Sequence, residues 1–492
     1  MSAMNLTLEQ AARGLADAQV LGDGGARIAR VHTDTRTLQA GDLFVALRGE
    51  RFDGAAFLAQ AARAGAAGAL ADAGARAALQ ACGLPGILAP DARRALGELA
   101  AFWRQRFDLP VIAVTGSNGK TTVTQMTAAI LHAWLGPAAH ATAGNLNNDI
   151  GVPLTVLGLR AEHRAAVVEL GMNHPGEIAR LAAITQPTVA LVNNAQREHQ
   201  EFMGTVEAVA RENGAVISAL PAAGIAVYPA HDAYTPVWDE LAGARWRIGF
   251  GTAAPGAQVF VRSADWVSDG PAGAHWRVQA QVVDRVAAFD LHAPGRHNLR
   301  NALAAAACAR AAGAPLETIA QGLAAFRPVA GRSRIVPLRC RDRVLTLIDD
   351  SYNANPDSVR ALIDLLAEMP SPRLLILGDM GEVGDQGPAF HDEMGRHARE
   401  RGIETLLTFG AQAEQASRAF RQAGGAGRHC ETIEDLTGAA LAALPDAASV
   451  AVKGSRFMRM ERAAAALIAA CASAAPEQAT MQFAQQEAAD AA

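Results

Sequence analysis

Residues 111–134 form the stretch that most constrains the fold of this chain. Four apolar residues, three of them β-branched, lead into a glycine-containing turn, and apolar side chains then recur at helical spacing at Val123, Met126, Ile130 and Trp134. This pattern predicts a buried parallel strand, a loop and a helix in direct succession. Such strands are typical of sheets that helices cover on both faces, so we expect an α/β fold.

The turn within this stretch has the chemistry of a phosphate-binding loop. It reads TGSNGKTT over residues 115–122. A loop at the start of a helix presents backbone N–H groups to an anion, while Lys120 can reach the outer phosphates and the Thr121 hydroxyl can bind Mg²⁺. Val114 stands where the commonest form of the motif has its first glycine, but a shorter turn ending in Gly-Lys-Thr forms the same cradle. The alternative is a glycine turn beside a surface lysine; because strand, turn and helix agree, we favour a nucleoside triphosphate site.

The whole chain is too long for a single hydrophobic core. Its 492 residues correspond to about three domains. The formal net charge of −5 provides no global basic field for nucleic acid, so anionic ligands must meet local positive charge. The start of the chain lacks a basic region followed by an apolar one, and no apolar run approaches the roughly 20 residues of a membrane span. We therefore expect a cytoplasmic protein without nucleic-acid or membrane partners.

The five cysteines are scattered along the chain, and none has the CxxC spacing of a zinc or redox motif. This pattern favours reduced thiols without a functional role over a disulfide or zinc framework. The five are Cys82, Cys308, Cys340, Cys430 and Cys471.

Residues 1–107 are predicted to form a small α/β domain. Residues 7–10 have the pattern of a capping box before a short helix. An alanine-rich, helix-prone segment covers residues 55–81, and residues 91–107 are predicted to form a connecting helix. A domain boundary near residue 107 follows.

Three arginines of this region, Arg36, Arg48 and Arg51, lie close together in sequence around an apolar strand. Two interpretations stay open. They are solvated side chains on a small domain, or they hold a phosphorylated ligand through bidentate guanidinium contacts.

Residues 108–328 alternate short apolar runs with longer helical ones, which is typical of a mostly parallel sheet wound on both faces. Ligands bind at the carboxyl ends of strands in such sheets, so the residues after the runs at 165–168 and 190–192 are candidates. Glu169 follows the first run, and a carboxylate beside a phosphate loop suits Mg²⁺. Asn193 and Asn194 follow the second run directly. His199 comes shortly after them, but a lone histidine is more often an ordinary surface or core residue.

Other segments of this central region have two interpretations. The polar loop at residues 144–153 could bind a polar substrate or form a simple turn. Residues 258–292 alternate apolar and polar side chains and are predicted to add antiparallel strands to the sheet. Residues 294–302 open an alanine-rich helix, whose first polar residues could contact a nucleotide or cap the helix.

The last third of the chain, residues 329–475, has its own strand and helix alternation, which indicates a second open sheet. Polar residues again follow the apolar runs. The predicted strands are residues 344–348, 374–377, 405–409 and 450–452, and the polar segments are 349–356, 378–382 and 453–456. Residues 476–492 are rich in Gln, Glu and Ala and are predicted to be a frayed tail.

Together these motifs resemble the Mur ligases, which are ATP-dependent amide-forming enzymes of peptidoglycan precursor synthesis. Two nucleotide motifs place the chain in the superfamily, and four further motifs resemble the branch that joins D-alanyl-D-alanine to UDP-N-acetylmuramoyl-tripeptide through an acyl phosphate. The first two are TGSNGKT at 115–121 and GRHN at 295–298 with Asn301 and Ala302; the others are GDLFVALRG at 41–49, GNLNN at 144–148, DDSYNANP at 349–356 and LGDMGE at 377–382.

The resemblance implies three domains with separate tasks. A small α/β N-terminal domain at residues 1–107 would bind the UDP end of the sugar nucleotide. A central P-loop-type domain with a mostly parallel sheet, residues 108–328, would bind ATP. A Rossmann-like C-terminal ligase domain at 329–475 would complete the site, and 476–492 would form a flexible tail. The product would be the UDP-N-acetylmuramoyl-pentapeptide, with ADP and phosphate.

The resemblance also implies roles for single residues. Lys120, Glu169 and His199 would act in catalysis, Lys120 on the β- and γ-phosphates, and Mg²⁺ would be held by Thr121, Glu169 and His199. The residues implied in nucleotide binding are Thr115, Gly116, Ser117, Asn118, Gly119, Lys120, Thr121, Thr122, His297, Asn298, Arg332 and Asp349. Those implied in contacts with the sugar nucleotide, its peptide or the incoming dipeptide are Thr35, Arg36, Arg48, Asn145, Asn148, Asn353 and Asn355.

One position departs from the family pattern. Mur ligases commonly have a lysine shortly after the His199 motif, carbamylated so that its carboxylate supports a second Mg²⁺, and Asn213 stands at that position here. A neutral amide cannot be carbamylated. Glu212 or a water-held metal could substitute, or the second site is weaker; we expect the chemistry to be kept because the other motifs are intact.

An acyl phosphate must be kept from water, so we expect the C-terminal domain to close onto the central one and to bring Arg332, Asp349 and Lys453 to the site. We also expect a monomer.

Other amide ligases, such as the one that adds the third stem residue or a folylpolyglutamate synthase, fit the motifs at 349–356 and 377–382 less well. A regulatory module that only hydrolyses or senses ATP would leave the flanking domains unexplained. The third stem residue, meso-diaminopimelate or lysine, and the group that takes the amine proton stay open.

Overall fold

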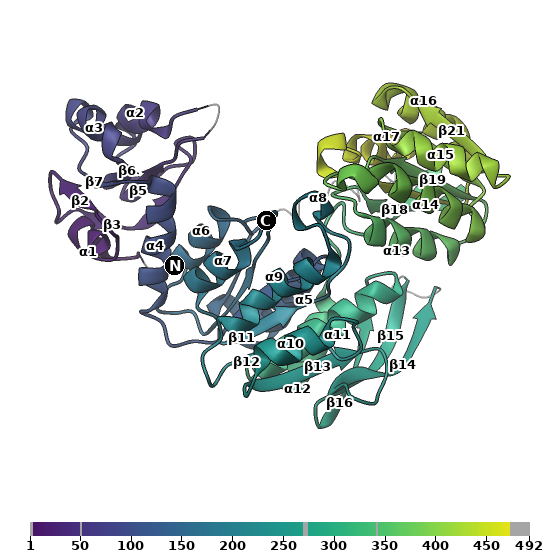
Figure 1. The fold of residues 1–492 in the computed structure, drawn as a ribbon, viewed down its shortest axis with the longest axis horizontal. Helices are drawn as coiled ribbons and strands as arrows, with labels where there is room; N and C mark the ends of the chain where they lie inside the picture. The colour runs from purple at the N-terminus through teal and green to yellow at the C-terminus, as the bar shows by residue number, and fades with distance from the viewer. Residues whose placement is uncertain (1–2, 50–51, 269–273, 341–342, 473–492) are drawn as a thin grey trace.

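The structure is a computed structural model that describes residues 3–49, 52–268, 274–340 and 343–472. Arg51 and the predicted tail at 476–492 therefore lie outside the described residues. Three parts of the chain are each built on their own sheet, and Figure 1 shows them in chain order from purple through teal to green and yellow. We call them the N-terminal, central and C-terminal units. The predicted α/β fold is confirmed, with one large sheet in each unit and a small two-stranded sheet, β1–β3, in addition.

The N-terminal unit contains a five-stranded sheet in the order β2-β7-β6-β5-β4, in which only β2 is antiparallel to its neighbour. The predicted capping box is present at Thr7, whose side chain accepts from the backbone N–H of Gln10. The strands are β2 (Gln19–Leu21), β4 (Arg30–His32), β5 (Asp42–Ala46), β6 (Gly68–Asp72) and β7 (Gly86–Ala89), with the small pair β1 (Leu6–Thr7) and β3 (Arg27–Ile28) and the helices α1 (Leu8–Ala12), α2 (Leu58–Arg63) and α3 (Arg76–Cys82).

The prediction of helix-prone structure throughout residues 55–81 is wrong in its middle, where β6 lies between α2 and α3. Leu70 of this strand is fully buried, and β6 pairs with a strand on each side. A side chain in place of Gly68 would come within 2.8 Å of Leu8. Burial between two strands outweighs the helix propensity of alanine here.

Helix α4 (Ala92–Arg104) is the predicted connecting helix, and Asp91 caps its start. Its buried residues Leu96, Leu99 and Trp103 belong to one hydrophobic core that includes residues of both the N-terminal and central units. The indole of Trp103 donates to the carbonyl oxygen of Leu159 at 3.0 Å. Because α4 packs against both units, the boundary near residue 107 stays a prediction.

The central sheet has nine strands in the order β16-β15-β14-β13-β12-β11-β8-β10-β9. The predicted strand of the phosphate loop is β8, which pairs in parallel with β10 and β11 near the middle of the sheet. The predicted antiparallel strands at 258–292 are present as β14, β15 and β16. The strands are β8 (Val111–Thr115), β9 (Ala139–Ala141), β10 (Ala165–Glu169), β11 (Val189–Val192), β12 (Ile225–Pro229), β13 (Trp246–Gly251), β14 (Val259–Val267), β15 (His275–Val282) and β16 (Arg285–Leu291).

Alternate residues of β8 face two separate cores, as a buried strand requires. Ile112 and Val114 pack with α5, α11 and α12, whereas Val111 and Ala113 pack with α6, α7, α9 and α10. These helices are α5 (Lys120–Leu135), α6 (Gly151–Leu157), α7 (Glu177–Thr185), α9 (Val206–Ser218), α10 (Thr235–Ala242), α11 (Arg296–Ala311) and α12 (Leu316–Ala325).

The C-terminal unit has a six-stranded sheet in the order β17-β18-β22-β19-β20-β21, parallel except for β17. All four predicted strands are present, and β17 and β21 were not predicted. The strands are β17 (Arg334–Cys340), β18 (Arg343–Asp350), β19 (Arg373–Gly378), β20 (Thr405–Phe409), β21 (Ala426–Cys430) and β22 (Ser449–Lys453), with the helices α13 (Pro356–Ala367), α14 (Gly387–Glu400), α15 (Ala413–Gln422), α16 (Ile433–Ala443) and α17 (Glu461–Ala472).

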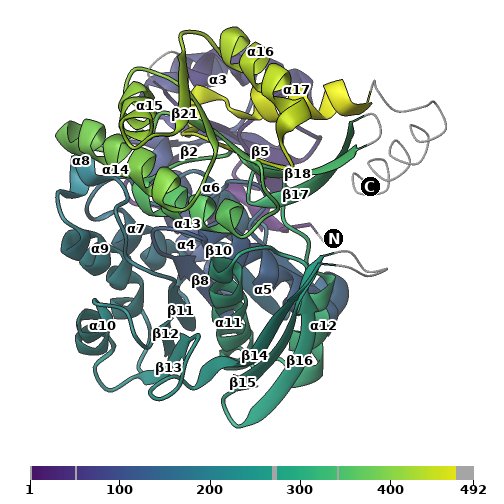
Figure 2. The same cartoon turned by 90° about the vertical axis from the view of Figure 1, so that its right-hand side faces the viewer.

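The C-terminal unit contacts the central unit beside α8 (Gln200–Met203), a single helical turn after β11. Figures 1 and 2 both place α8 at the edge of the C-terminal unit, and in Figure 2 it lies close to α14. Within the described residues, no helix is long and apolar enough to cross a membrane.

The expectation that all cysteines are reduced is wrong for one pair. Cys340 at the end of β17 and Cys471 near the end of α17 are joined in a disulfide, with their Cα atoms 4.6 Å apart. The two lie 131 residues apart in sequence, so only the packing of α17 against the sheet brings them together. Cys82, Cys308 and Cys430 are free.

Candidate active site

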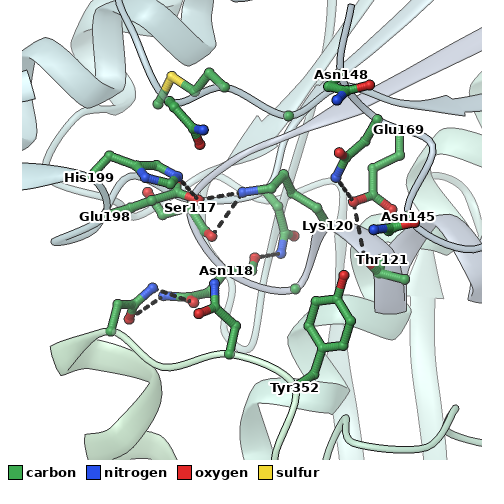
Figure 3. Close-up of a pocket in the computed structure, with 18 of the residues that line it drawn as sticks. Ser117, Asn118, Lys120, Thr121, Asn145, Asn148, Glu169, Glu198, His199 and Tyr352 are labelled. Carbon is green, nitrogen blue, oxygen red and sulfur yellow. Dashed lines mark hydrogen bonds and ion pairs between the residues drawn. The ribbon is translucent and has the colours of Figure 1, made fainter. Parts of the chain in front are cut away.

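A cavity of about 1650 Å³ lies where the central and C-terminal units meet, and it extends to α4. Its walls include residues 117–122 of the phosphate loop, the residues after β10 and β11, the start of α11, and the segments after β18 and β22. The strand-end segments singled out in the sequence therefore gather around one space, as the geometry of parallel sheets predicts. Figure 3 shows part of this wall.

Two glycines shape the phosphate loop. Gly116 and Gly119 have φ angles of +130° and +81°, in the region that side chains rarely adopt. A side chain at Gly116 would come within 2.9 Å of the backbone nitrogen of Asn193, and one at Gly119 within 2.5 Å of the side chain of Asn301. The loop is thus held close to the end of β11 and to α11.

Asparagines after β11 fix the tip of the loop. The side-chain oxygen of Asn194 accepts from the backbone N–H of Asn118 at 2.9 Å, and the side-chain nitrogen of Asn193 donates to the carbonyl oxygen of Asn118 at 2.8 Å. The loop therefore has a defined conformation before any anion binds.

Thr121 and Glu169 form a pair that fits a magnesium ion. The Thr121 hydroxyl donates to one Glu169 carboxylate oxygen at 3.0 Å, and Asn147 donates to the same oxygen at 2.8 Å. Glu169 is almost fully buried, and its second oxygen has no hydrogen-bond partner within the described structure. A buried carboxylate oxygen without a partner, beside a hydroxyl and a phosphate loop, is a suitable ligand for a hard cation.

His199 does not lie beside Thr121 and Glu169. Figure 3 shows Lys120 between them, with His199 on the side of Glu198. The two imidazole nitrogens of His199 face Glu198 at 3.4 Å and Glu382 of the C-terminal unit at 2.5 Å. No group of three or more His, Cys, Asp or Glu side chains suited to a metal occurs among the described residues. The magnesium role of His199 therefore stays a prediction.

The charge on His199 is held by its acidic neighbours. Burial lowers the pKa of His199, but the ion pairs with the carboxylates of Glu198 and Glu382 outweigh it and raise the pKa to about 9. The imidazole is consequently protonated at neutral pH. It carries a positive charge between a carboxylate of the central unit and one of the C-terminal unit.

Lys120 is paired with Glu198, a residue that the sequence analysis did not single out. Its ammonium group lies 2.5 Å from a Glu198 oxygen and donates to the carbonyl oxygens of Gly116 and Ser117 at 2.6 and 3.1 Å. Glu198 is buried, and its other oxygen has no hydrogen-bond partner in the described structure. In the sequence, the acidic residues on both sides of His199 were the signal that could have identified Glu198.

Lys453 faces the same cavity from the C-terminal unit. It is paired with Asp350 and donates to the carbonyl oxygen of Asn353 at 2.9 Å. Lys120 and Lys453 are the two lysines of the chain, whereas all other basic side chains among its 44 lysines and arginines are arginines. Both lysines line the cavity.

Asp349, predicted to hold the nucleotide, does not face the cavity. Its carboxylate accepts from the backbone N–H of Gly331 at 2.9 Å and from the Ser351 hydroxyl at 2.6 Å, so it supports the turn below the site. Its neighbour Asp350 lines the cavity instead. The alternation of side chains along β18 explains why only one of the two aspartates points inward.

Of the other predicted nucleotide residues, Thr115 and Gly116 are not among the described residues that line the cavity, whereas residues 117–122, His297, Asn298 and Arg332 are. His297 and Arg332 both line it, and the guanidinium of Arg332 lies 4.1 Å from the centre of the Tyr352 ring. Burial lowers the pKa of His297 and keeps this imidazole neutral. Asn298 accepts from Asn301 at 3.0 Å and donates to the carbonyl oxygen of Pro294 at 2.7 Å.

The predicted substrate residues divide into two groups. Asn145, Asn148, Asn353 and Asn355 line the cavity. Thr35, Arg36 and Arg48 are not among the described residues that line it; they belong to the N-terminal unit. Arg36 is exposed and pairs with Asp34, and the backbone of Arg48 bridges to Asp53.

Asn213 and Glu212 both have structural partners away from the cavity. The side-chain oxygen of Asn213 accepts from the Thr115 hydroxyl at 2.6 Å and from the backbone N–H of Gly116 at 3.0 Å, so it lies below the phosphate loop. The carboxylate of Glu212 accepts from the backbone N–H groups of Gly176 and Ile178 at the start of α7. The suggestion that Glu212 replaces a carbamylated lysine is therefore wrong, because its carboxylate caps a helix.

Family models match nearly all of the described chain. Residues 27–104 match "Mur ligase family, catalytic domain", residues 114–309 match "Mur ligase middle domain", and residues 331–456 match "Mur ligase, glutamate ligase domain". The three matches follow the order of the three sheets.

Several relatives are similar over almost their full length. UDP-N-acetylmuramoyl-tripeptide--D-alanyl-D-alanine ligase of Escherichia coli (strain K12) is 42% identical over 446 residues, which cover 89% of this chain and 93% of that protein. The protein of the same name from Haemophilus influenzae is 34% identical, with 90% and 94% covered. The crystal structure of MurF from Acinetobacter baumannii is 31% identical and has a TM-score of 0.83, with 95% of this chain and 100% of that chain covered. The chain belongs to the Mur ligase family.

Proposed function

We propose that this protein is the ATP-dependent ligase that joins D-alanyl-D-alanine to UDP-N-acetylmuramoyl-tripeptide and releases ADP and phosphate. One observation carries the proposal: a single cavity brings the phosphate loop and the Thr121–Glu169 pair together with residues 350–358 of the C-terminal unit. The names and similarity of the relatives from Escherichia coli and Haemophilus influenzae support the identity of the two substrates. The nucleotide-linked substrate implies a cytoplasmic reaction, and we propose that the protein acts as a monomer.

The reaction needs a better leaving group than oxide, and ATP supplies it. The terminal carboxylate of the tripeptide attacks the γ-phosphorus, which gives an acyl phosphate and ADP. The amine of D-alanyl-D-alanine then attacks the acyl carbon and displaces phosphate, and the amine loses a proton. Positioning of the reactants and electrostatic stabilisation of the phosphoryl oxygens supply most of the rate in such transfers.

The residues of the cavity provide these effects. The loop N–H groups and Lys120 bind the phosphates, which requires Lys120 to exchange its contact with Glu198 for the phosphate oxygens. Thr121 and Glu169 would hold Mg²⁺, which would neutralise negative charge on the phosphates. His199 keeps its position through Glu198 and Glu382.

Other residues bind the ends of the substrates. His297, Asn298 and Arg332 would border the nucleotide, while Asp349 acts on it only through the turn that it supports. Asn145, Asn148, Asn353 and Asn355 would contact the peptide and the dipeptide, and Thr35, Arg36 and Arg48 would bind the UDP end. We propose domain boundaries near residues 107, 328 and 475 on this basis.

The test is phosphate release by the purified protein with ATP and Mg²⁺, with UDP-N-acetylmuramoyl-tripeptide present and D-alanyl-D-alanine present or omitted. Turnover that requires both substrates, with a pentapeptide product by mass, supports the proposal. Turnover that is indifferent to both would favour an ATPase module and overturn it. Parallel assays with meso-diaminopimelate and lysine tripeptides identify the preferred third residue.

A further inference from the structure

One arginine of the central unit is inserted into the C-terminal unit. The guanidinium of Arg197 donates to Asp357 at the start of α13 at 2.7 Å and to Glu393 in α14 at 2.7 Å. Its backbone N–H also donates to Asp357 at 2.8 Å, and its guanidinium lies 5.2 Å from the centre of the Phe390 ring. A single side chain thus contacts two helices of the neighbouring unit.

The charges of this contact are well matched. The Arg197 side chain is 22% exposed. Burial alone would lower its pKa, but hydrogen bonds to Asp357 and Glu393 raise the pKa above its ordinary value. The planar guanidinium can bind both carboxylates at once, which an ammonium group cannot do with the same geometry.

Glu393 has a second arginine partner that provides a natural comparison. Arg360 of α13 donates to Glu393 at 2.6 Å. Arg360 and Glu393 both belong to the C-terminal unit, whereas Arg197 reaches Glu393 from the central unit. The same carboxylate therefore takes part in one contact within a unit and one contact between units.

The chain around Arg197 connects this contact to the phosphate loop. The next residue, Glu198, holds Lys120, and His199 faces Glu382 of the C-terminal unit. A second bridge lies on the other side, where Asn118 of the loop and Asn355 exchange two side-chain hydrogen bonds of 2.8 and 3.2 Å. The position of the C-terminal unit is thus linked to the position of the Glu198 carboxylate, which is paired with Lys120.

We propose that Arg197 is a positioning residue that anchors the C-terminal unit on residues 196–201 and thereby sets Glu198 against Lys120. Arg197 is not among the residues that line the cavity in the described structure, so it acts through its neighbours. The proposal deepens the proposed ligase function, because correct docking of the C-terminal unit completes the cavity in which the acyl phosphate forms.

The test compares Arg197→Ala and Arg197→Lys with Arg360→Ala as the matched control. Three properties are measured for each: the radius of gyration by small-angle scattering, the rate of acetylation of each lysine by mass spectrometry, and kcat with the KM values for ATP and D-alanyl-D-alanine. Acetylation is informative because the two lysines of the chain both line the cavity. Thermal unfolding checks that each variant folds.

We expect Arg197→Ala to increase the radius of gyration and the acetylation of both lysines, and to lower kcat roughly 10²-fold, since small misplacements of reacting groups have effects of that size. Arg197→Lys should lie between Arg197→Ala and the wild type in radius of gyration, lysine acetylation and kcat, because it keeps the charge. Arg360→Ala should stay within about twofold of the wild type in kcat, because it leaves the contact between units in place.

Other results overturn the proposal. Scattering and acetylation of Arg197→Ala equal to the wild type would show that Arg197 does not dock the C-terminal unit. An equal effect of Arg360→Ala would assign the cluster to the stability of α13 and α14. If Arg197→Ala does not fold, Arg197→Lys decides by the same criteria. A wild type without ligase activity would refute the proposed function, while scattering and acetylation would still decide the docking role.

Discussion

The two sides of the cavity are built in different ways. On the phosphate-loop side, β8, the loop and α5 follow one another directly in the chain, and residues at the ends of neighbouring strands hold them in place. On the docking side, residues 196–201 contact the C-terminal unit through ion pairs such as Arg197–Asp357, at the start of α13, and His199–Glu382, in the loop after β19. The first side is fixed by one sheet, whereas the second exists only when two units are docked. We therefore expect changes to the first to alter phosphate binding, and changes to the second to alter the arrangement of the units.

The largest effect is expected for Lys120→Ala on the phosphate-loop side. Removing the ammonium group that stabilises the phosphoryl charge should lower kcat by roughly 10³-fold or more. Thermal unfolding is measured alongside, because the change also leaves the buried carboxylate of Glu198 without its lysine partner and should lower the stability of the fold. Steady-state phosphate release measures the effect, and near-normal turnover would remove the loop from the mechanism.

Asn213→Ala tests the support below the loop. It removes the acceptor of two hydrogen bonds from Thr115 and Gly116. Two such bonds are worth about 1 kcal/mol each, so we expect the KM for ATP to rise roughly tenfold or more, with a smaller change in the KM for the dipeptide. Asn213→Asp is the matched variant because it keeps an acceptor oxygen at the same place. Equal effects on both KM values would show that Asn213 supports the unit as a whole.

The contact between the C-terminal and central units should weaken at low pH. Burial raises the pKa of Glu393, but hydrogen bonds to Arg197 and Arg360 outweigh it and lower the pKa below the ordinary 4.5. A carboxyl whose pKa is lowered contributes stability that is complete above its ordinary value and is lost as the pH falls through the lowered one.

We therefore expect the radius of gyration of the wild type to be constant from neutral pH down to about 4.5 and to rise below it. Arg197→Ala, in which the contact between units is already absent, should show a weaker change. An identical pH profile for both proteins would contradict the role of Glu393 in docking.

Substitutions of Asn355 are expected to have the smallest effect on stability and lysine acetylation. This residue lies in the C-terminal unit and contacts Asn118 of the phosphate loop. Its side-chain oxygen accepts from the backbone N–H of Ser358 and caps α13, and its nitrogen donates to Asn118. Asn355→Ala should lose about 1 kcal/mol of stability from the missing cap. Asn355→Asp keeps the cap and loses only the donor to Asn118, so its unfolding temperature should match the wild type while lysine acetylation rises slightly. A lower unfolding temperature for Asn355→Asp would argue against this separation.

The phosphate-loop side could be predicted almost completely from the sequence. The strand, turn and helix each have a local signal, and the position of Glu169 and Asn193 follows from the rule that parallel strands end at one edge of a sheet. The docking side could not be predicted in this way. Arg197 and Glu198 lie in a short polar segment whose partners, such as Asp357 and Lys120, are at least 78 residues away in the chain.

The sequence by itself determined the α/β fold, the phosphate loop and the family motifs, because these depend on local periodicity and on fixed spacings. The tertiary structure decided which of two adjacent aspartates, Asp349 or Asp350, faces the cavity. It decided that Asn213 supports the loop while Glu212 caps a helix, that residues 68–72 form a strand, and that Cys340 meets Cys471. Each of these outcomes depends on which distant surfaces pack together, and packing is set by burial of side chains that are far apart in the sequence.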